Sequence, residues 1–434
     1  MNVGNEYKRK IIFTILSIFG AAIIGFAFLC FVYLIPTSPI REEVKRSVPV
    51  FEKETEIFNW APNYSFAYAD NFTDSIILNT ASFASDESVF SNALMNYRYQ
   101  SNEPYASQIL SLSESMTSSD SESHKLQYAR YWHGYLVFIK PLLTILDYSA
   151  IRLLNFFIQF ILAFAVIRAT EIKLGKRVAF AFMGVLFIIS PITTGLCLQL
   201  SPVYYITLLS SLAILLKGKD SKIKDWQVLL WTGIAVSYFD LLTYPIVSLG
   251  IPLLFSIAKG VCHNFTDQIK QLMECSFFWG IGYGGMWFSK WLLATLVTGK
   301  NVIADAISNI FIRTNNQVTE AGLGNMSITK SEAIAKNFDQ LANRPFMIVA
   351  ILLLTIIALL TVVQMLRKSD FFHFSPRIVM IDIILFYPLC WYIVLSNHSY
   401  IHYWMTYRGL CISYFSLMLT IIYLFKNSKK RSKV

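Results

Sequence analysis

Long apolar runs separated by short polar segments make up most of this chain. The first run extends from Ile11 to Ile35 and follows three basic residues, Lys8, Arg9 and Lys10. It is longer than the roughly 7 to 15 residues of a signal-peptide core, so we expect a retained transmembrane helix with a cytoplasmic N-terminus. Nine later runs have the same character. The expected spans, about ten in all, cover residues 11–35, 151–169, 178–196, 203–216, 226–239, 245–258, 274–297, 346–366, 378–395 and 404–425.

A long polar loop, residues 36–149, follows the first span. Helical periodicity of apolar residues predicts amphipathic helices in this loop at residues 41–51, 70–81 and 86–97. Residues 111–123 are rich in Ser, which indicates a mobile segment. Residues 128–141 mix aromatic and aliphatic residues with charged ones. This stretch is too polar for a span, so we expect an interfacial helix there.

The rest of the chain, residues 150–425, is expected to hold the remaining spans and a second polar segment at 298–345, before a basic tail at 426–434. Lys and Arg concentrate in alternate loops beginning with the N-terminal segment. The positive-inside rule therefore places both termini in the cytoplasm and both long polar segments on the exterior face of the cell membrane.

Composition agrees with this pattern. Hydrophobic residues make up 55% of the 434 residues and charged residues only 15%, against roughly 25% charged in soluble domains. We therefore predict an all-α polytopic membrane protein. The net charge of +10 comes from cations in short loops, which argues against a nucleic-acid partner. The six cysteines show no metal-ligand spacing, so neither a disulfide framework nor a zinc site is indicated.

Two carboxylates in the first loop, Asp70 and Asp74, are the leading catalytic candidates. They are four residues apart, so on a helix they share one face. One of them would act as a general base toward an acceptor hydroxyl, or both would hold a divalent cation such as Mg²⁺ or Mn²⁺. The alternative is that Asp70 is a helix N-cap and Asp74 a favourable charge in the first turn. No cofactor is required by the sequence.

Other polar groups fall on the same predicted face. Arginine binds phosphate with two hydrogen bonds, and histidine donates or accepts one, so these groups would bind an anionic substrate. Their alternatives are snorkelling cations, an interfacial aromatic belt and wetted helix ends. His398 and His402 are four apart but have no Glu between them, so they lack the metalloprotease signature. The candidate substrate-binding residues are Arg130, His133, Asp240, Tyr244, Lys290, Arg313, His398, His402 and Arg408.

A long exterior loop after the first span, an acidic residue within it and many later helices resemble the GT-C superfamily of integral-membrane glycosyltransferases. The resemblance is architectural and covers most of the chain. It implies a polyprenyl-phosphate-linked sugar as donor and an essential carboxylate in the first exterior loop, which corresponds here to Asp70 or Asp74. The segment from Arg130 to Gly134 also resembles segments of bacterial envelope proteins.

The resulting hypothesis is an inverting transfer of a sugar to a cell-envelope glycan or lipid on the exterior face. A carboxylate would deprotonate the acceptor while Arg and His groups stabilise the phosphate leaving group. Two alternatives are left open. One is a flippase or transporter of lipid-linked saccharides, and the other is a noncatalytic membrane scaffold.

Overall fold

The computed structural model describes residues 3–62, 64–118, 120, 122–218, 220–260, 264–320, 324–342 and 376–431. Within these ranges the chain is mostly helical and has three two-stranded antiparallel sheets. The α-helices are α1 (Val3–Tyr33), α2 (Thr37–Glu54), α3 (Asn71–Ser82), α4 (Val89–Met95), α5 (Gln108–Thr117), α6 (Leu136–Leu142), α7 (Tyr148–Leu174), α8 (Lys176–Ile189), α9 (Pro191–Leu196), α10 (Ser201–Leu216), α11 (Asp225–Phe239), α12 (Ile246–Lys259), α13 (Phe265–Thr298), α14 (Val302–Thr314), α15 (Lys330–Ala342), α17 (Pro376–Leu385), α18 (Tyr387–Val394), α19 (Ser396–Ile401), α20 (Tyr403–Thr406) and α21 (Leu410–Arg431). The paired strands are β1 (Ile57–Asn59) with β2 (Tyr68–Asp70), β3 (Arg98–Tyr99) with β4 (Lys125–Leu126), and β5 (Gln317–Glu320) with β6 (Gly324–Ser327).

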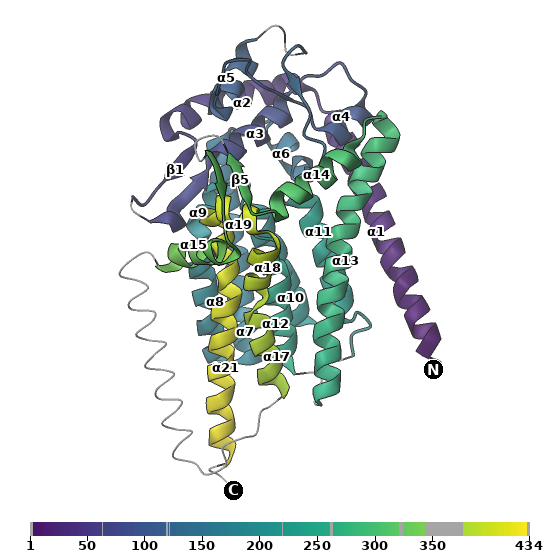
Figure 1. The fold of residues 1–434 in the computed structure, drawn as a ribbon, viewed down its shortest axis with the longest axis vertical. Helices are drawn as coiled ribbons and strands as arrows, with labels where there is room; N and C mark the ends of the chain where they lie inside the picture. Colours follow the sequence, from purple (N-terminus) through teal and green to yellow (C-terminus); the bar gives the residue numbers. More distant parts are fainter. Residues whose placement is uncertain are drawn as a thin grey trace.

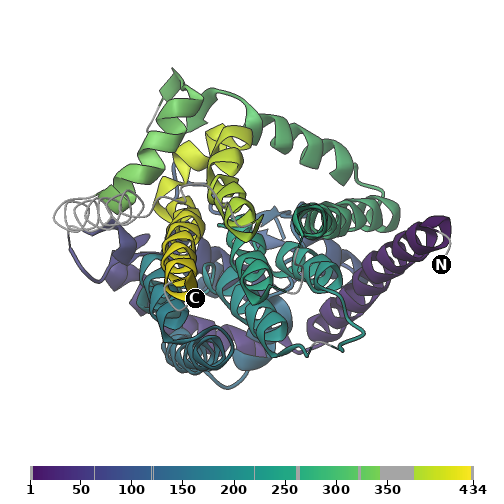
Figure 2. The ribbon, with the colours of Figure 1, turned by 90° about the horizontal axis from the view of Figure 1, so that it is seen from below.

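The long helices run side by side, and a cap made of α2 to α6 covers one end of them (Figure 1). The beginning of α1 and the end of α21 lie at the other end of the molecule (Figure 1). Seen from below, the bundle helices appear end-on, and α1 lies at its edge, packed on α13 (Figure 2).

Four helices in the described ranges are long and apolar enough to cross a membrane. They lie at Gly4–Tyr33, Tyr148–Leu174, Pro376–Val394 and Tyr403–Phe425. The prediction of a mostly helical protein with helices long and apolar enough to span a membrane is therefore confirmed.

The number of ten spans is not supported. α8, α10, α11 and α12 are helical as predicted but have 14, 16, 15 and 14 residues. At 1.5 Å per residue such helices are shorter than the roughly 30 Å hydrocarbon core. α13 has 34 residues but is not apolar enough to count among the four. The span expected at 346–366 lies outside the described residues.

Burial explains why apolar runs alone overstate the number of spans. In α12 every residue from Ile246 to Ala258 is buried. An apolar segment that faces protein on all sides has the same sequence pattern as one that faces lipid. The run at 245–258 therefore predicts a buried helix correctly without showing that it crosses a membrane.

The cap follows the predicted amphipathic pattern in part. α2 includes the expected helix at 41–51, and α3 begins one residue after the start of the expected helix at 70–81, whereas α4 is shorter than 86–97. The prediction of a mobile segment at 111–123 is wrong for its first half, because α5 extends to Thr117 and buries Ser111 and Leu112. The interfacial helix predicted at 128–141 is also partly wrong, because turns precede α6, which begins at Leu136.

Glycines allow α11 and α13 to approach very closely. A Cβ atom on Gly282 of α13 would lie 2.4 Å from the Leu230 carbonyl oxygen, and one on Gly233 of α11 would lie 2.2 Å from that of Trp279. Small residues at helix contacts are typical of membrane bundles, where close packing replaces the hydrophobic effect. This contact fixes α13, whose cap end continues through Gly299 into α14.

Candidate functional site

Four aromatic side chains follow one face of α13 at a spacing of four residues. Trp279, Tyr283, Trp287 and Trp291 have successive ring centroids 5.1, 5.4 and 5.6 Å apart. Residues four apart are neighbours on a helix surface, so the rings form a continuous series. We call these four residues the aromatic ladder.

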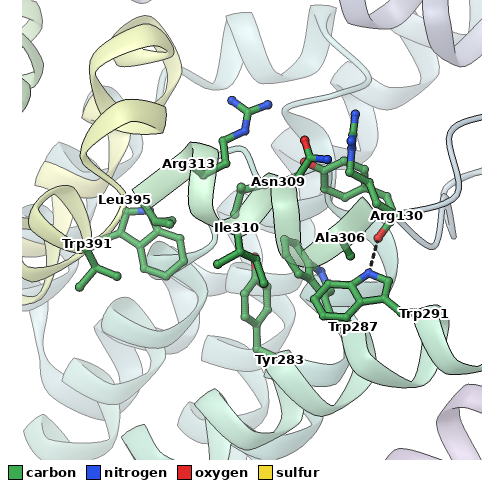
Figure 3. Close-up of a pocket in the computed structure, with 13 residues that line it drawn as sticks. Arg130, Tyr283, Trp287, Trp291, Ala306, Asn309, Ile310, Arg313, Trp391 and Leu395 are labelled. Atoms are coloured by element: carbon green, nitrogen blue, oxygen red, sulfur yellow. Dashed lines mark hydrogen bonds between the residues drawn. The ribbon is translucent and has the colours of Figure 1, made fainter. Parts of the chain in front are cut away.

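The last three rings of the ladder form one wall of a cavity of about 180 Å³, which we call the aromatic cavity. A face of α14 forms a second wall. Figure 3 shows that the Arg130 and Arg313 side chains extend toward the same side of this cavity, while Tyr283 and Trp287 lie on the other side of α14. The remaining lining residues are Tyr131, Leu242, Ala306, Asn309, Ile310, Trp391, Val394 and Leu395.

Three residues that line the aromatic cavity each carry a polar atom without a hydrogen-bond partner among the described residues. These atoms are the Tyr283 hydroxyl and the indole Nε1 atoms of Trp287 and Trp391, and all three atoms are buried. A buried polar group without a partner costs about 1 to 3 kcal/mol. Such groups are rarely left unpaired in native proteins.

Arg313 is held by two histidines at one edge of the cavity. Its Nη1 donates to His398 Nδ1 at 3.1 Å and to His402 Nε2 at 2.8 Å. Burial lowers the pKa of His402 to about 3, with a further contribution from Arg313, and burial also lowers the pKa of His398. Both rings are therefore neutral at pH 7 and accept hydrogen bonds. The second nitrogen of His398 donates to the Leu242 carbonyl at 2.8 Å.

Arg130 stands at the other edge with a partly exposed side chain. Its guanidinium lies 3.5 Å from Asp305 of α14 and 5.4 Å from the centre of the Tyr128 ring. Its carbonyl accepts a hydrogen bond from Trp291 Nε1 at 2.9 Å, which ties this loop to the aromatic ladder. The predicted anion ligands Arg130 and Arg313 thus line one cavity, and His398 and His402 support the second of them.

Asp240 belongs to a tight turn behind the cavity. Its carboxylate accepts from the Thr243 amide at 2.9 Å and from the Thr243 hydroxyl at 2.5 Å. The same turn contains Leu242, which lines the cavity and has a positive φ of 65°, a conformation that is strained for a bulky side chain. Burial raises the pKa of Asp240 to about 7, although the hydrogen bonds from the turn lower it.

His133 and Lys290 are not among the residues that line the aromatic cavity. His133 bonds within its own loop, whereas Lys290 links the bundle helix α13 to the cap. His133 is bonded to the Tyr135 hydroxyl at 2.5 Å and to the Tyr128 carbonyl at 2.9 Å, and burial lowers its pKa to about 3. Lys290 Nζ donates to the Leu94 carbonyl at 2.7 Å. Lys290 therefore caps the last turn of α4, where a cation is favourable.

Tyr244 and Arg408 are also held by backbone carbonyls. The Tyr244 hydroxyl donates to Leu200 at 2.6 Å, and Arg408 Nε donates to Ile189 at 2.8 Å. Arg408 therefore satisfies a carbonyl at the end of α8. The Arg408 side chain is fully buried, and neither Arg408 nor Tyr244 lines the described cavities.

Asp70 is the N-cap of α3, as the capping alternative predicts. Its Oδ1 accepts from the Thr73 amide at 3.1 Å and its Oδ2 from the Thr73 hydroxyl at 2.6 Å. The side chain is buried, and this burial raises its pKa to about 7. Asp70 and Asp240 thus share one local motif, an Asp followed three residues later by a Thr that donates twice to it.

Asp74 lies in the first turn of α3, again as the capping alternative predicts, but its partners are distant in sequence. Its Oδ2 accepts from the Tyr148 hydroxyl at 2.6 Å and the Leu198 amide at 2.8 Å. Its Oδ1 accepts from the Gln199 amide at 2.9 Å. The fully buried carboxylate therefore binds the cap to the turn between α9 and α10.

Neither Asp70 nor Asp74 is among the residues that line the described cavities. A divalent-cation site at this pair also lacks further ligands. Within the described ranges, no three His, Cys, Asp or Glu side chains come together in a group that could hold a metal ion.

The aromatic ladder is a part of the site that the search for polar residues in the sequence does not identify. Its signal is present in the sequence as Trp279, Tyr283, Trp287 and Trp291 at constant spacing. Trp391 and Leu395 carry no comparable signal, since only the tertiary fold brings them to α13.

Comparisons of the chain with protein-family models, with curated proteins and with solved structures give no match. The functional argument therefore rests on the geometry of the site.

Proposed function

We propose that this chain is an integral-membrane glycosyltransferase that takes a sugar from a polyprenyl-phosphate donor. The observation that carries the proposal is the aromatic cavity, which Arg130 and Arg313 line together with Tyr283, Trp287 and Trp391, three side chains whose buried donors lack partners among the described residues. A volume of about 180 Å³ is below the roughly 300 to 1,000 Å³ of pockets for drug-sized ligands. It suits one sugar phosphate better than an oligosaccharide.

Each part of this ligand has a counterpart in the cavity. Arg130 and Arg313 would bind the phosphate, because guanidinium groups bind phosphate with paired, charge-assisted hydrogen bonds. Tyr283, Trp287 and Trp391 would donate to sugar oxygens. The exposed apolar side chains of α14, Ile307 and Phe311 among them, would contact the lipid chain.

The proposed reaction is a single displacement with inversion at the anomeric carbon. A carboxylate removes the proton of the acceptor hydroxyl, whose oxygen forms the new bond as the bond to the lipid phosphate breaks. The two arginines stabilise the negative charge that develops on the leaving phosphate. Asp240 is the favoured base, because its turn supplies a cavity wall, and Asp70 is the second candidate with a matching pKa.

We further propose that the cap and the aromatic cavity face the cell exterior and that both termini are cytoplasmic. The basic residues near both termini support this orientation through the positive-inside rule. The position of the chain ends opposite the cap agrees with it (Figure 1). In this orientation the acceptor is a glycan or lipid of the cell envelope.

The test is sugar transfer by the full chain in proteoliposomes. Radiolabelled polyprenyl-phosphate hexoses are supplied with an envelope glycan and lipid extract, and labelled product is quantified. We expect Asp240→Asn to lower turnover by roughly 10²-fold or more, in the range of general-base contributions, and Asp86→Asn, at an exposed position of the cap, to leave it unchanged. Full turnover in Asp240→Asn together with loss in Asp70→Asn would move the base to Asp70, and full turnover in both would refute catalysis by either of these carboxylates.

The pH profile gives an independent readout of the base. Only the ionised carboxylate accepts a proton, and the pKa of Asp240 is raised to about 7. The rate should therefore rise about tenfold per pH unit below 7 and level off above it. A rate that is constant between pH 5 and 8 would contradict the assignment.

A flippase would use the same cavity to hold a lipid-linked sugar. The proteoliposome assay separates the two functions because it follows bond formation and lipid movement independently. Movement of labelled lipid between leaflets without a new glycosidic bond would favour the flippase. A scaffold would produce neither outcome.

A further inference from the structure

A second cavity, of about 450 Å³, lies on the cap side of Arg130. We call it the basic cavity, because Arg98, Arg130 and Lys300 line it together with a single carboxylate, Asp305. Its walls come from α3, from the β3–β4 pair and the loop that follows it, and from the start of α14. Arg130 lines both cavities, so the two are neighbours across one side chain.

Arg98 indicates that the basic cavity is built for an anion. It is 91% buried, as its residual exposure is 9%, and its Nε has no hydrogen-bond partner within the part of the chain that the structure describes. Its Nη1 donates to Gln100 and Gln108, both of which are neutral. Within the same part of the chain, Arg98 forms no ion pair with a carboxylate. A buried cation without a counter-charge is costly and is compensated when an anion binds.

α14 connects the two cavities. Val302 and Asp305 line the basic cavity, and Ala306, Asn309 and Arg313 line the aromatic cavity. Their spacing of three and four residues places them along a single helix face. The start of α14 lies in the basic cavity, where the partial positive charge of a helix N-terminus adds to the side-chain cations.

We propose that the basic cavity binds an acidic saccharide as the acceptor, with its anionic group at Arg98 and Lys300. The inference rests on the proposed function for the role of acceptor but not for binding itself. The larger volume is within the range of pockets for larger ligands, and the rings of Phe72 and Tyr128 give the cavity apolar surface for sugar rings. The anionic group is a carboxylate or a phosphate, since both match the same guanidinium and ammonium donors.

The test is direct binding to the full chain in nanodiscs of zwitterionic lipid, measured by isothermal titration calorimetry without any donor. The probes are trigalacturonate for the carboxylate, glucose 6-phosphate for the phosphate and maltotriose as the neutral saccharide. We expect at least one acidic probe to bind and maltotriose to bind at least tenfold more weakly. Because surface charges are screened by salt, binding should weaken as ionic strength rises.

Lys300→Gln is the informative variant, because Lys300 is exposed and its Nζ has one side-chain hydrogen bond, to the Tyr97 hydroxyl, so we expect the fold to tolerate its loss. This substitution should lower the affinity for the acidic probe roughly tenfold, which corresponds to one charge-assisted hydrogen bond. Lys45→Gln, at an exposed site of α2 that does not line the cavity, should bind like the unmodified chain. Equal binding of acidic and neutral probes, or no effect of Lys300→Gln, would overturn the proposal.

The outcomes also separate this inference from the proposed function. Binding of an acidic probe without sugar transfer under any condition would refute the glycosyltransferase but keep the anion site. Sugar transfer to a neutral acceptor by a chain that binds no acidic probe would refute the acidic acceptor alone.

Discussion

The hydrogen-bond partners of Asp74 determine its role in the structure. Its position in the first turn of a predicted helix was readable from sequence, and so was its carboxylate chemistry. Its partners are not readable, because Tyr148, Leu198 and Gln199 are 74 to 125 positions away along the chain. Three donors to one buried carboxylate make it a structural anchor of the cap.

Asp74→Ala should therefore destabilise the protein whether or not it is catalytic. The substitution leaves a buried hydroxyl and two buried amides without their acceptor, so we expect a loss of about 3 kcal/mol or more. Thermal unfolding of the purified chain in detergent measures this effect, with Asp86→Ala in the exposed cap as the control. An unchanged melting temperature would show that the carboxylate is not a structural anchor.

The polar residues of the site differ in whether their own residue type or contacts with distant residues determine where they lie. Arg130, Arg313, His398 and His402 were selected from sequence as exterior polar groups, and they do come together around the cavity edge. Lys290 was selected on the same grounds and instead caps α4, because its side chain meets carbonyls 196 residues away. Residue type and predicted side of the membrane reduce the number of candidate site residues. Long-range contacts determine which of the candidates lie at the site.

Among the elements, α13 and α14 position the site. α13 carries the aromatic ladder and is fixed against α11 by Gly233 and Gly282, where a Cβ would meet backbone atoms at 2.2 to 2.4 Å. Periodicity predicted α11 and α13 as helices, and it also placed α2 and α3. It could not predict the glycine contact, because a glycine inside an apolar run does not reveal which helix it faces.

Gly282→Ala should separate α11 from α13, since the added methyl group would lie 2.4 Å from the Leu230 carbonyl oxygen. Overpacking of this kind costs about 1 to 3 kcal/mol and should also loosen the aromatic cavity. Gly280→Ala is the matched control in the same helix, because nothing lies within 4 Å of its Cβ position.

The control substitution should be neutral or stabilising by up to about 1 kcal/mol, because Ala is a better helix former than Gly. Thermal unfolding and sugar transfer of the two variants measure the difference. Equal stability of Gly280→Ala and Gly282→Ala would contradict the close contact.

At the scale of the whole molecule, the cap and the bundle both contribute residues to the aromatic cavity. Arg130 comes from the loop between β4 and α6 in the cap, and the aromatic ladder comes from a bundle helix. Trp391 comes from a segment about 260 residues after Arg130. Sequence reasoning predicted the helical class, the membrane-spanning character and the polar first loop. It overestimated the spans because apolar helices buried in protein and in lipid look alike.

The most direct test of the central claim is a cryo-EM map of the full chain in nanodiscs, prepared with a polyprenyl-phosphate hexose. We predict density for the phosphate between Arg130 and Arg313, with the sugar ring in contact with Tyr283, Trp287 and Trp391. Trp287→Phe, which keeps an aromatic side chain but removes the unpartnered donor, should lower the occupancy of the sugar. Density for the donor at a site away from this cavity, or an empty cavity at saturating donor, would contradict the account.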